Sequence, residues 1–339
     1  MKRYAVRNRY ESARLEAISE AKALHRKLDT KRKFAVSKQG FVDVFGAIED
    51  LKIPLVFDEL DALGFCLPYP HLGIMINKNR SLHIQRFTAG HELGHAVLEH
   101  EGSVDHRLNY RGGMDAPSSD PVQEVAADAF AAEFMLPRWL YKQHIQTQGW
   151  SIDKHLRNPE IVYQLSLRMG ASYEATCWGL LSHNILAKTF VEELVSTEVA
   201  MIKRSTVADN LPGNSWANVW RLSQKDNGAF YPADTQDLLR LDLSEVRDSR
   251  TTWDVTALKD VGFEILSDDT QMAFDCVESD RRVVVRPPHK EIGEVLISQR
   301  EPNASITAQS PILGVVLDLG GKEIGKLSRG LKRKRGLVA

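Results

Sequence analysis

The sequence has few cysteines, no long apolar run and almost no net charge, and each absence excludes a class of protein. Its three cysteines, Cys66, Cys177 and Cys276, are odd in number and far apart, which argues against a disulfide framework. No apolar run reaches the 18 or more residues of a membrane-spanning helix. The chain has 44 basic and 45 acidic residues, so its net charge is −1. This balance gives the protein no overall electrostatic attraction to nucleic acid or to a membrane.

No apolar secretory segment follows Met1, so we expect a cytoplasmic protein in a reducing compartment, with no membrane partner. The content of 43% hydrophobic and 26% charged residues is that of a soluble globular protein. Basic residues do cluster at 25–33 and 330–336, and we interpret both clusters as solvated surface and tail rather than as binding patches.

The pattern of residues changes twice along the chain, which predicts an α+β protein of three domains. A chain of 339 residues is too long for one core, since single cores rarely exceed about 250–300 residues. Residues 1–145 mix helical periodicity with short β-rich runs such as "GFCLPY" and "LGIMINK", and residues 146–205 are helical in pattern. Residues 206–339 contain short β-rich runs between turn residues, which predicts a sandwich-like β domain with a basic tail.

The stretch "RFTAGHELGHAVLEH" (86–100) contains a pattern with chemical meaning, HELGH. On a helix, His91 and His95 lie one turn apart on the same face and can share one cation. Glu92 follows directly and can act as general base. The alternative is an ordinary amphipathic helix whose histidines bond to carbonyl groups, because short patterns of this kind also recur by chance.

A catalytic zinc site needs a third protein ligand and an open position for water. The metzincin arrangement is excluded, because Glu101 stands where its third histidine would be and Leu98 replaces the required glycine. If the helix continues, His100 lies about 180° around it from His91 and points away.

The segment "EVAAD" (124–128) supplies a better candidate for the third ligand. Glu124 is expected to bind the metal, and Asp128, one turn further on the same face, can accept the ring N–H of a ligating histidine. Small residues would let this helix pack close to the HELGH helix; they are Ala126, Ala127, Ala129, Ala131 and Ala132. The two segments together predict a site for one zinc ion.

"RFTAGHELGHAVLEH" followed by "EVAADAFAAEFMLP" resembles the ImmA/IrrE family of zinc metallo-endopeptidases, over roughly residues 40–137. The resemblance implies a zincin-like fold for the first domain, with zinc ligands at His91, His95 and Glu124 and a catalytic glutamate at Glu92. The family's usual asparagine is replaced by Asp128, which is closer to the gluzincin pattern. The resemblance also implies protein substrates that include helix-turn-helix (XRE-type) repressors, in stress response, phage or mobile-element control or toxin–antitoxin regulation.

Two further sets of residues are weaker candidates for the same site. The strand before the HELGH helix resembles the strand at that place in the family and is expected to bind substrate by edge pairing. Its candidate residues are Ile74, Met75, Ile76 and Asn77. Tyr110 and Arg111, in the loop between the two motifs, are candidates for stabilising the transition state, and each can equally be an ordinary loop contact.

Residues 159–184 are typical of a helix-turn-helix, with Gly170 at the turn and Ser172 at an N-cap position. DNA binding is one interpretation. The second helix carries Tyr173, Glu174 and Trp178 but no arginine or lysine to meet phosphates, which favours a structural or partner-docking role.

Residues 237–269 faintly resemble the chagasin-type inhibitor fold, although "DSRTTWD" lacks the usual N-P-T-T-G-Y. An unrelated all-β recognition domain fits these residues as well. For the whole chain, the leading hypothesis is a zinc endopeptidase that cleaves a DNA-binding repressor or antitoxin-like regulator. The alternatives are a non-catalytic binding module that acts with a partner regulator, and a DNA-binding regulator.

Overall fold

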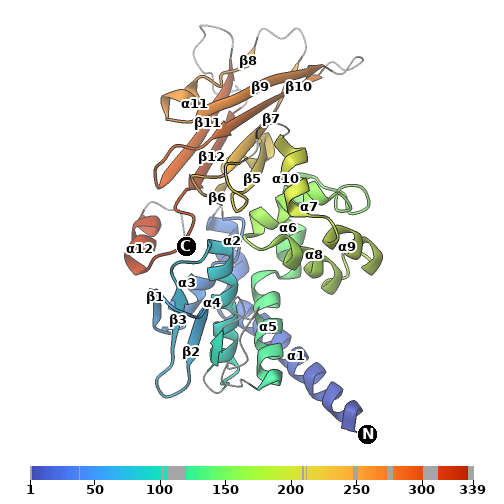
Figure 1. Cartoon of the computed structure of the whole chain (residues 1–339), viewed down its shortest axis with the longest axis vertical. Helices are drawn as coiled ribbons and strands as arrows, with labels where there is room; N and C mark the ends of the chain where they lie inside the picture. Colours follow the sequence, from blue (N-terminus) through green and yellow to red (C-terminus); the bar gives the residue numbers. More distant parts are fainter. Residues whose placement is uncertain are drawn as a thin grey trace. The chain divides into compact units, whose positions relative to one another are not determined.

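The computed structural model describes residues 2–37, 39–100, 103–105, 120–207, 210, 212–246, 251–272, 278–300 and 312–334. Mostly helical segments precede two β-sheets in the C-terminal part, which confirms the predicted α+β class and the all-β C-terminal domain (Figure 1). Among the described residues, every helix is too short or too polar to cross a lipid bilayer.

The chain divides into two compact units, which we call the first unit and the second unit. The first unit comprises the residues up to Tyr141, residues 169–175 and the residues from Lys322 onward. The second unit comprises residues 142–168 and 176–321. This grouping does not test the predicted domain boundaries at 145 and 205, which stay predictions. It does group the described residues after 321 with the two motifs of the first unit.

The first unit combines a four-stranded sheet with the helices that carry both motifs. Its helices are α1 (Lys2–Lys27), α2 (Thr30–Ser37), α3 (Val44–Asp50), α4 (Leu82–Val97), α5 (Pro121–Met135) and α12 (Lys326–Lys334). Its strands are β1 (Leu55–Asp58), β2 (Gly64–Leu67), β3 (Gly73–Asn77) and β4 (Ser103–Asp105). The expected strands before the HELGH helix therefore form.

The sheet has the order β1-β3-β2-β4, so that β3 lies inside it. β3 runs parallel to β1 and antiparallel to β2. Helix α4 packs on this sheet, and Gly64 in β2 makes the close approach possible. A Cβ at Gly64 would meet the Thr88 Cγ2 of α4 at 2.6 Å, so a larger residue there would push the helix away.

Helix α5 packs against α4 through small residues on both helices. A Cβ on Gly94 would lie 3.1 Å from the Ala127 Cα, and a Cβ on Gly90 would lie 3.5 Å from the Ala131 Cβ. Since Gly90 pairs with the later alanine, the two helices run antiparallel. The expected close packing is therefore present at two of the alanines, whereas Ala132 is exposed.

The C-terminal segment of the first unit is held by buried polar contacts. The Gln85 amide of α4 accepts the Glu323 backbone N–H at 2.7 Å and donates to the Glu323 carbonyl at 2.9 Å. Arg329 of α12 is 3% exposed and donates to Asp43 Oδ2 at 2.8 Å, with a Glu49 oxygen 3.4 Å from its Nε. The residue directly before the predicted solvated cluster 330–336 is thus a buried, paired arginine.

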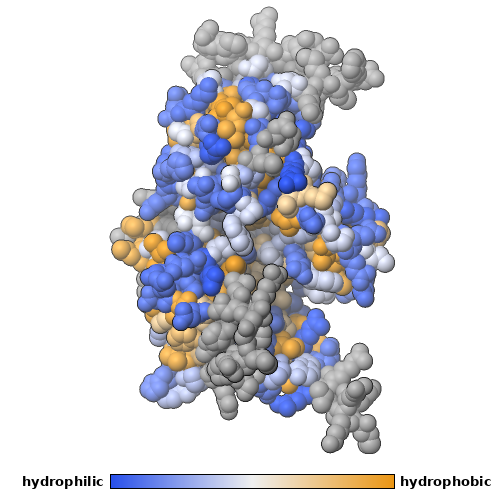
Figure 2. Space-filling model, in the orientation of Figure 1, coloured by the Kyte–Doolittle hydropathy of each residue, from blue (hydrophilic) through white to orange (hydrophobic). Residues whose placement is uncertain are grey.

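The outer face of this segment is apolar. Ile324, Leu327 and Leu331 are 59%, 82% and 48% exposed, and Figure 2 shows hydrophobic surface over α12, the red helix of Figure 1.

The second unit joins helices to two four-stranded sheets. Helix α6 (Arg138–Gln148) begins in the first unit, and the following helices are α7 (Pro159–Met169), α8 (Tyr173–Ser182), α9 (Lys188–Val195) and α10 (Val199–Val207). One sheet has the order β5 (Val219–Ser223), β7 (Leu238–Val246), β10 (Glu278–Arg286), β9 (Glu264–Met272). The other has the order β6 (Phe230–Pro232), β12 (Ile312–Asp318), β11 (Ile292–Arg300), β8 (Thr252–Trp253). Short η2 (Gln224–Asp226) and α11 (Ala257–Asp260) lie between strands.

The segment with the predicted helix-turn-helix forms the expected helices α7 and α8. Gly170 adopts a left-handed φ of 63° at the turn, and the Ser172 hydroxyl accepts the Ala175 N–H at 3.2 Å. Tyr173 and Thr176 of α8 are buried, so they are not available to a base edge. A DNA-binding role for this segment stays a prediction.

Candidate metal centre

Helix α4 places the two histidines of HELGH side by side. They are four residues apart, which puts their rings one above the other on one helix face. His91 and His95 are each 1% exposed, and their Nε2 atoms lie 3.0 Å apart. Two imidazole nitrogens so close and so buried are a natural pair of ligands for one cation.

Helix α5 brings a carboxylate to the same point. The helix begins after Asp120, whose side chain accepts the Val122 N–H at 3.0 Å, and Pro121 occupies its first turn. Glu124 therefore lies in the first turn, with carboxylate oxygens 3.4 Å from His91 Nε2 and 3.5 Å from His95 Nε2. One ligand atom from each of the three residues lies within 4.8 Å of the others. These residues can hold a metal ion.

Asp128, one turn after Glu124, orients the first of these histidines. His91 Nδ1 lies 3.1 Å from Asp128 Oδ1. Because a carboxylate accepts hydrogen bonds, this contact favours the tautomer of His91 with its proton on Nδ1 and its lone pair on Nε2. The lone pair is then directed at the point where Glu124 and His95 converge.

His100 was expected to point away, and that expectation is wrong. Helix α4 ends at Val97, Glu99 adopts a left-handed φ of 53°, and the His100 N–H donates to the His95 carbonyl at 3.0 Å. The chain thus turns back over the helix end and places His100 Nδ1 3.0 Å from His95 Nδ1. Burial lowers the pKa of His100, which favours its neutral form. No glycine or proline marks this helix end, so it could not be predicted from local residue types.

Glu92 is completely buried next to the histidines. It is close enough to β2 that its charge contributes, after burial as the larger cause, to raising the pKa of the Cys66 thiol to about 12. Cys66 therefore stays protonated and is not a competing thiolate ligand.

The expected edge pairing of a substrate with β3 is wrong, because β3 has no free edge. Ile74, Met75, Ile76 and Asn77 pair with β1 on one side, and β2 covers the other side of the strand. The Asn77 amide donates to the Leu60 and Ala62 carbonyls, which holds the turn before β2. Tyr110 and Arg111 lie outside the described residues.

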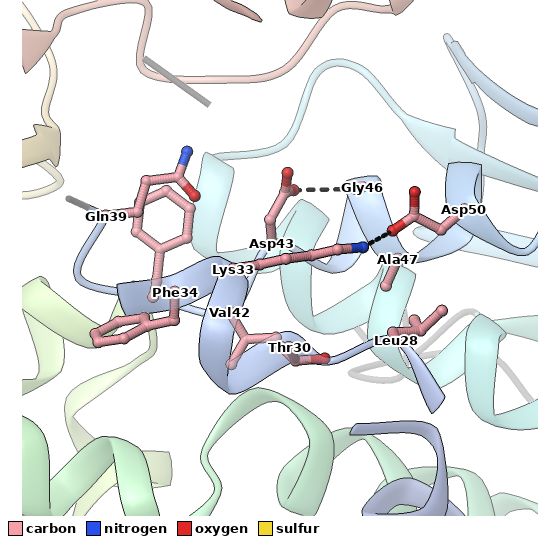
Figure 3. Close-up of a pocket in the computed structure, with 11 residues that line it drawn as sticks. Leu28, Thr30, Lys33, Phe34, Gln39, Val42, Asp43, Gly46, Ala47 and Asp50 are labelled. Carbon is pink, nitrogen blue, oxygen red and sulfur yellow. Dashed lines mark hydrogen bonds and ion pairs between the residues drawn. The ribbon is translucent and has the colours of Figure 1, made fainter. Parts of the chain in front are cut away.

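A cavity of about 450 Å³ is present elsewhere in the first unit, between α2, α3 and the segment that joins them (Figure 3). Figure 3 shows Lys33 reaching Asp50 and the Asp43 carboxylate accepting the Gly46 N–H. None of its lining residues belongs to the metal group, so this cavity and the metal centre are separate features.

Comparisons with known proteins agree with this geometry in the region of the two motifs. Residues 49–180 match the family model of the IrrE N-terminal-like domain, Peptidase_M78. No curated protein matches the chain.

Two solved structures share a low likeness with part of the chain. A cysteine protease inhibitor from Entamoeba histolytica, EhICP2, has 15% identity and a TM-score of 0.26 over 31% of this chain and 99% of its own. Amebosin has 12% identity and a TM-score of 0.24 over 30% of this chain and 96% of its own. At these TM-scores the likeness assigns no fold, and the chagasin-like character of the C-terminal domain stays a prediction.

The family match spans the HELGH helix, the helix with Glu124 and the strand β3. It confirms the resemblance found in the sequence: residues 49–180 are similar to the metallopeptidase domain of the ImmA/IrrE type.

Proposed function

We propose that this protein is a zinc-dependent endopeptidase that cleaves a small number of specific proteins in the cytoplasm. The observation that carries the proposal is the convergence of His91 Nε2, His95 Nε2 and the Glu124 carboxylate inside a peptidase domain. Two imidazoles and one carboxylate are a ligand set of catalytic zinc sites, which leave the fourth position open. The contacts of both Nδ1 atoms support the tautomers that such binding needs.

A zinc ion held by these residues supplies Lewis acidity, which polarises the scissile carbonyl and lowers the pKa of water. The chain supplies the proton transfers. Glu92 takes a proton from the attacking water and delivers it to the leaving amine, so that the carboxylate is regenerated at the end of the cycle. Its complete burial supports this role, because a carboxylate shielded from bulk water keeps the proton that it takes within the site.

The edge of the sheet offers a place for an extended substrate segment. Among the described residues, β4 pairs with β2 alone, and it contacts α4. We propose that an extended substrate segment adds to β4 as a further strand through backbone hydrogen bonds. β4 thus takes the place of β3 as the proposed substrate-binding strand, because both edges of β3 are paired.

The substrate class comes from the family resemblance. It implies helix-turn-helix (XRE-type) repressors or antitoxin-like regulators, whose removal would change transcription in stress response, mobile-element control or toxin–antitoxin regulation. The lack of basic residues on α8 supports protein rather than DNA as the principal partner.

The test is a substrate trap built on Glu92→Gln. This change keeps the three metal ligands and removes the base, so the variant should bind zinc with wild-type stoichiometry and hold uncleaved substrate. Both forms are expressed in the native host, and captured proteins are identified by mass spectrometry. Each captured protein is then incubated with wild-type or variant protein and zinc. Cleavage by the wild type alone supports the proposal.

Two outcomes contradict the endopeptidase. Cleavage by Glu92→Gln at the wild-type rate would remove Glu92 from its role. A partner that binds both forms and stays intact with wild type and zinc would favour the non-catalytic binding module instead.

A further inference from the structure

His100 stands in the outer layer of the metal centre, where the family signature assigns no residue. We propose that His100 is a positioning residue: its Nδ1 accepts the Nδ1–H of His95 and holds that imidazole in the tautomer whose Nε2 can bind a metal. The two Nδ1 atoms lie 3.0 Å apart, and the ring centroids are 5.0 Å apart with an interplanar angle of 72°. This distance is that of a hydrogen bond.

Counting protons fixes the direction of this bond. A metal-binding Nε2 needs its lone pair, so a neutral His95 carries its one proton on Nδ1. Two nitrogens 3.0 Å apart can share one proton, whereas two lone pairs or two N–H groups would repel each other. His100 is therefore neutral, accepts at Nδ1 and carries its own proton on Nε2.

The backbone fixes this contact as well. The His100 N–H donates to the His95 carbonyl at 3.0 Å, so the same two residues are joined by a backbone bond and by a side-chain bond. The left-handed conformation of Glu99 makes the return possible. His100 is half-buried, which limits competition by water for the nitrogen of His95.

The two metal-binding histidines thus have different orienting partners. His91 meets the carboxylate of Asp128, whereas His95 meets a neutral imidazole. Glu92, Glu124 and Asp128 already bring three carboxylates to the centre. A neutral acceptor orients His95 without adding a fourth negative charge beside them.

The test measures zinc affinity of the full chain by competition with a chromophoric chelator, which needs no substrate. His100→Phe keeps a ring and removes the acceptor, so zinc affinity should fall 10- to 100-fold, the usual loss for an orienting partner of a metal ligand. His100→Gln offers an amide oxygen as acceptor and should restore the affinity to within about threefold. His71→Phe, at an exposed histidine of the same unit, is the matched control and should leave affinity unchanged.

A second measurement needs no variant and decides the matter if His100→Phe fails to fold. In the zinc-loaded wild-type protein with ¹⁵N-labelled histidines, His95 should be the Nδ1–H tautomer and should show scalar coupling to His100 Nδ1. An uncoupled pair, or a proton on His100 Nδ1, overturns the proposal.

This inference rests on the metal site of the proposed function, and the two can fail separately. If the wild type binds zinc and a folded His100→Phe binds it equally well, only the role of His100 is lost. If the wild type binds no zinc, the zinc site and the role of His100 are both wrong.

Discussion

The Ala127 Cα lies 3.1 Å from the position that a Cβ on Gly94 would occupy. The Ala127 carbonyl oxygen and the Phe130 Cβ are each 3.2 Å from the same point, so this crossing of α4 and α5 has no room for a side chain. Gly94 precedes His95, and Ala127 follows Glu124 by three residues. The distance between the helices at this crossing therefore sets how closely Glu124 approaches the two histidines.

Gly94→Val should separate the helices and weaken both stability and metal binding. Overpacking by a branched side chain against backbone atoms costs about 2 kcal/mol of unfolding free energy, and the shift of α5 should lower zinc affinity at least tenfold. Gly90→Ala is the control, because it meets the Met135 Cγ at 3.2 Å, and a methionine side chain can move. Urea unfolding and zinc titration check both variants. Equal zinc affinity in Gly94→Val and wild type would contradict the role of the crossing.

Removal of metal should destabilise the first unit. A ligand that binds only the folded state adds about 2.7 kcal/mol at a hundredfold excess over its Kd. Chelation should therefore lower the Tm of the wild type, and Glu124→Ala should abolish the difference between zinc-loaded and chelated samples. Differential scanning calorimetry with and without chelator checks this. A zinc-dependent Tm that persists in Glu124→Ala would mean that the ion binds elsewhere.

Gly170→Ala should be more damaging than a typical glycine substitution at positive φ. A Cβ there would come within 1.9 Å of Arg86 Nη1, and Arg86 is a buried cation that lies over the Phe41 ring and donates to the Val42 carbonyl. Strain at the left-handed φ and displacement of the guanidinium together should cost about 3 kcal/mol of stability. Gly228→Ala, at a φ of 78° in open space, should cost only about 1 kcal/mol. An equal loss of unfolding free energy in the two variants would show that the Arg86 side chain can move aside without cost.

His25 should make the first unit acid-sensitive between about pH 6.5 and pH 4. Burial lowers the pKa of His25 from 6.5 to about 4, and its ring stacks on Phe134 at 4.6 Å between centroids. Between these pH values His25 is protonated in the unfolded chain but neutral in the folded protein. The free energy of unfolding therefore falls as the pH falls, by up to about 2–3 kcal/mol.

His25→Phe keeps the stacking and removes the titration. The difference in unfolding free energy between variant and wild type should then grow in favour of the variant from pH 7 to pH 4. Urea unfolding of metal-free protein at several pH values measures it, and a pH-independent difference would remove His25 as the cause.

The metal group was predictable because its geometry is local to helices. The spacing of His91 and His95, and of Glu124 and Asp128, places each pair on one helix face, whatever the rest of the fold does. The small residues Gly94 and Ala127 then indicate the close crossing between the two helices. The α+β class followed in the same way from periodicity along each segment.

Features that depend on distant pairing or on unmarked helix ends were not predictable. The position of β3 inside the sheet depends on pairing with β1 and β2, which no local pattern encodes. His100 returns to His95 because α4 ends without a glycine or proline. Arg329 directly precedes the basic run 330–336, which is typical of a solvated tail, and only the fold brings Asp43 and Glu49 to it.

The division of the chain into two units limits how the units can be separated by proteolysis or truncation. The backbone passes between the units four times, at residues 141–142, 168–169, 175–176 and 321–322. Cleavage of a single peptide bond therefore cannot release either unit intact. A protein ended after the family match at residue 180 would also lack the arginine that neutralises Asp43 and Glu49. The first unit is thus completed by a segment that follows the second unit in the sequence, so the contacts of Arg329 cannot form until the whole second unit has been synthesised.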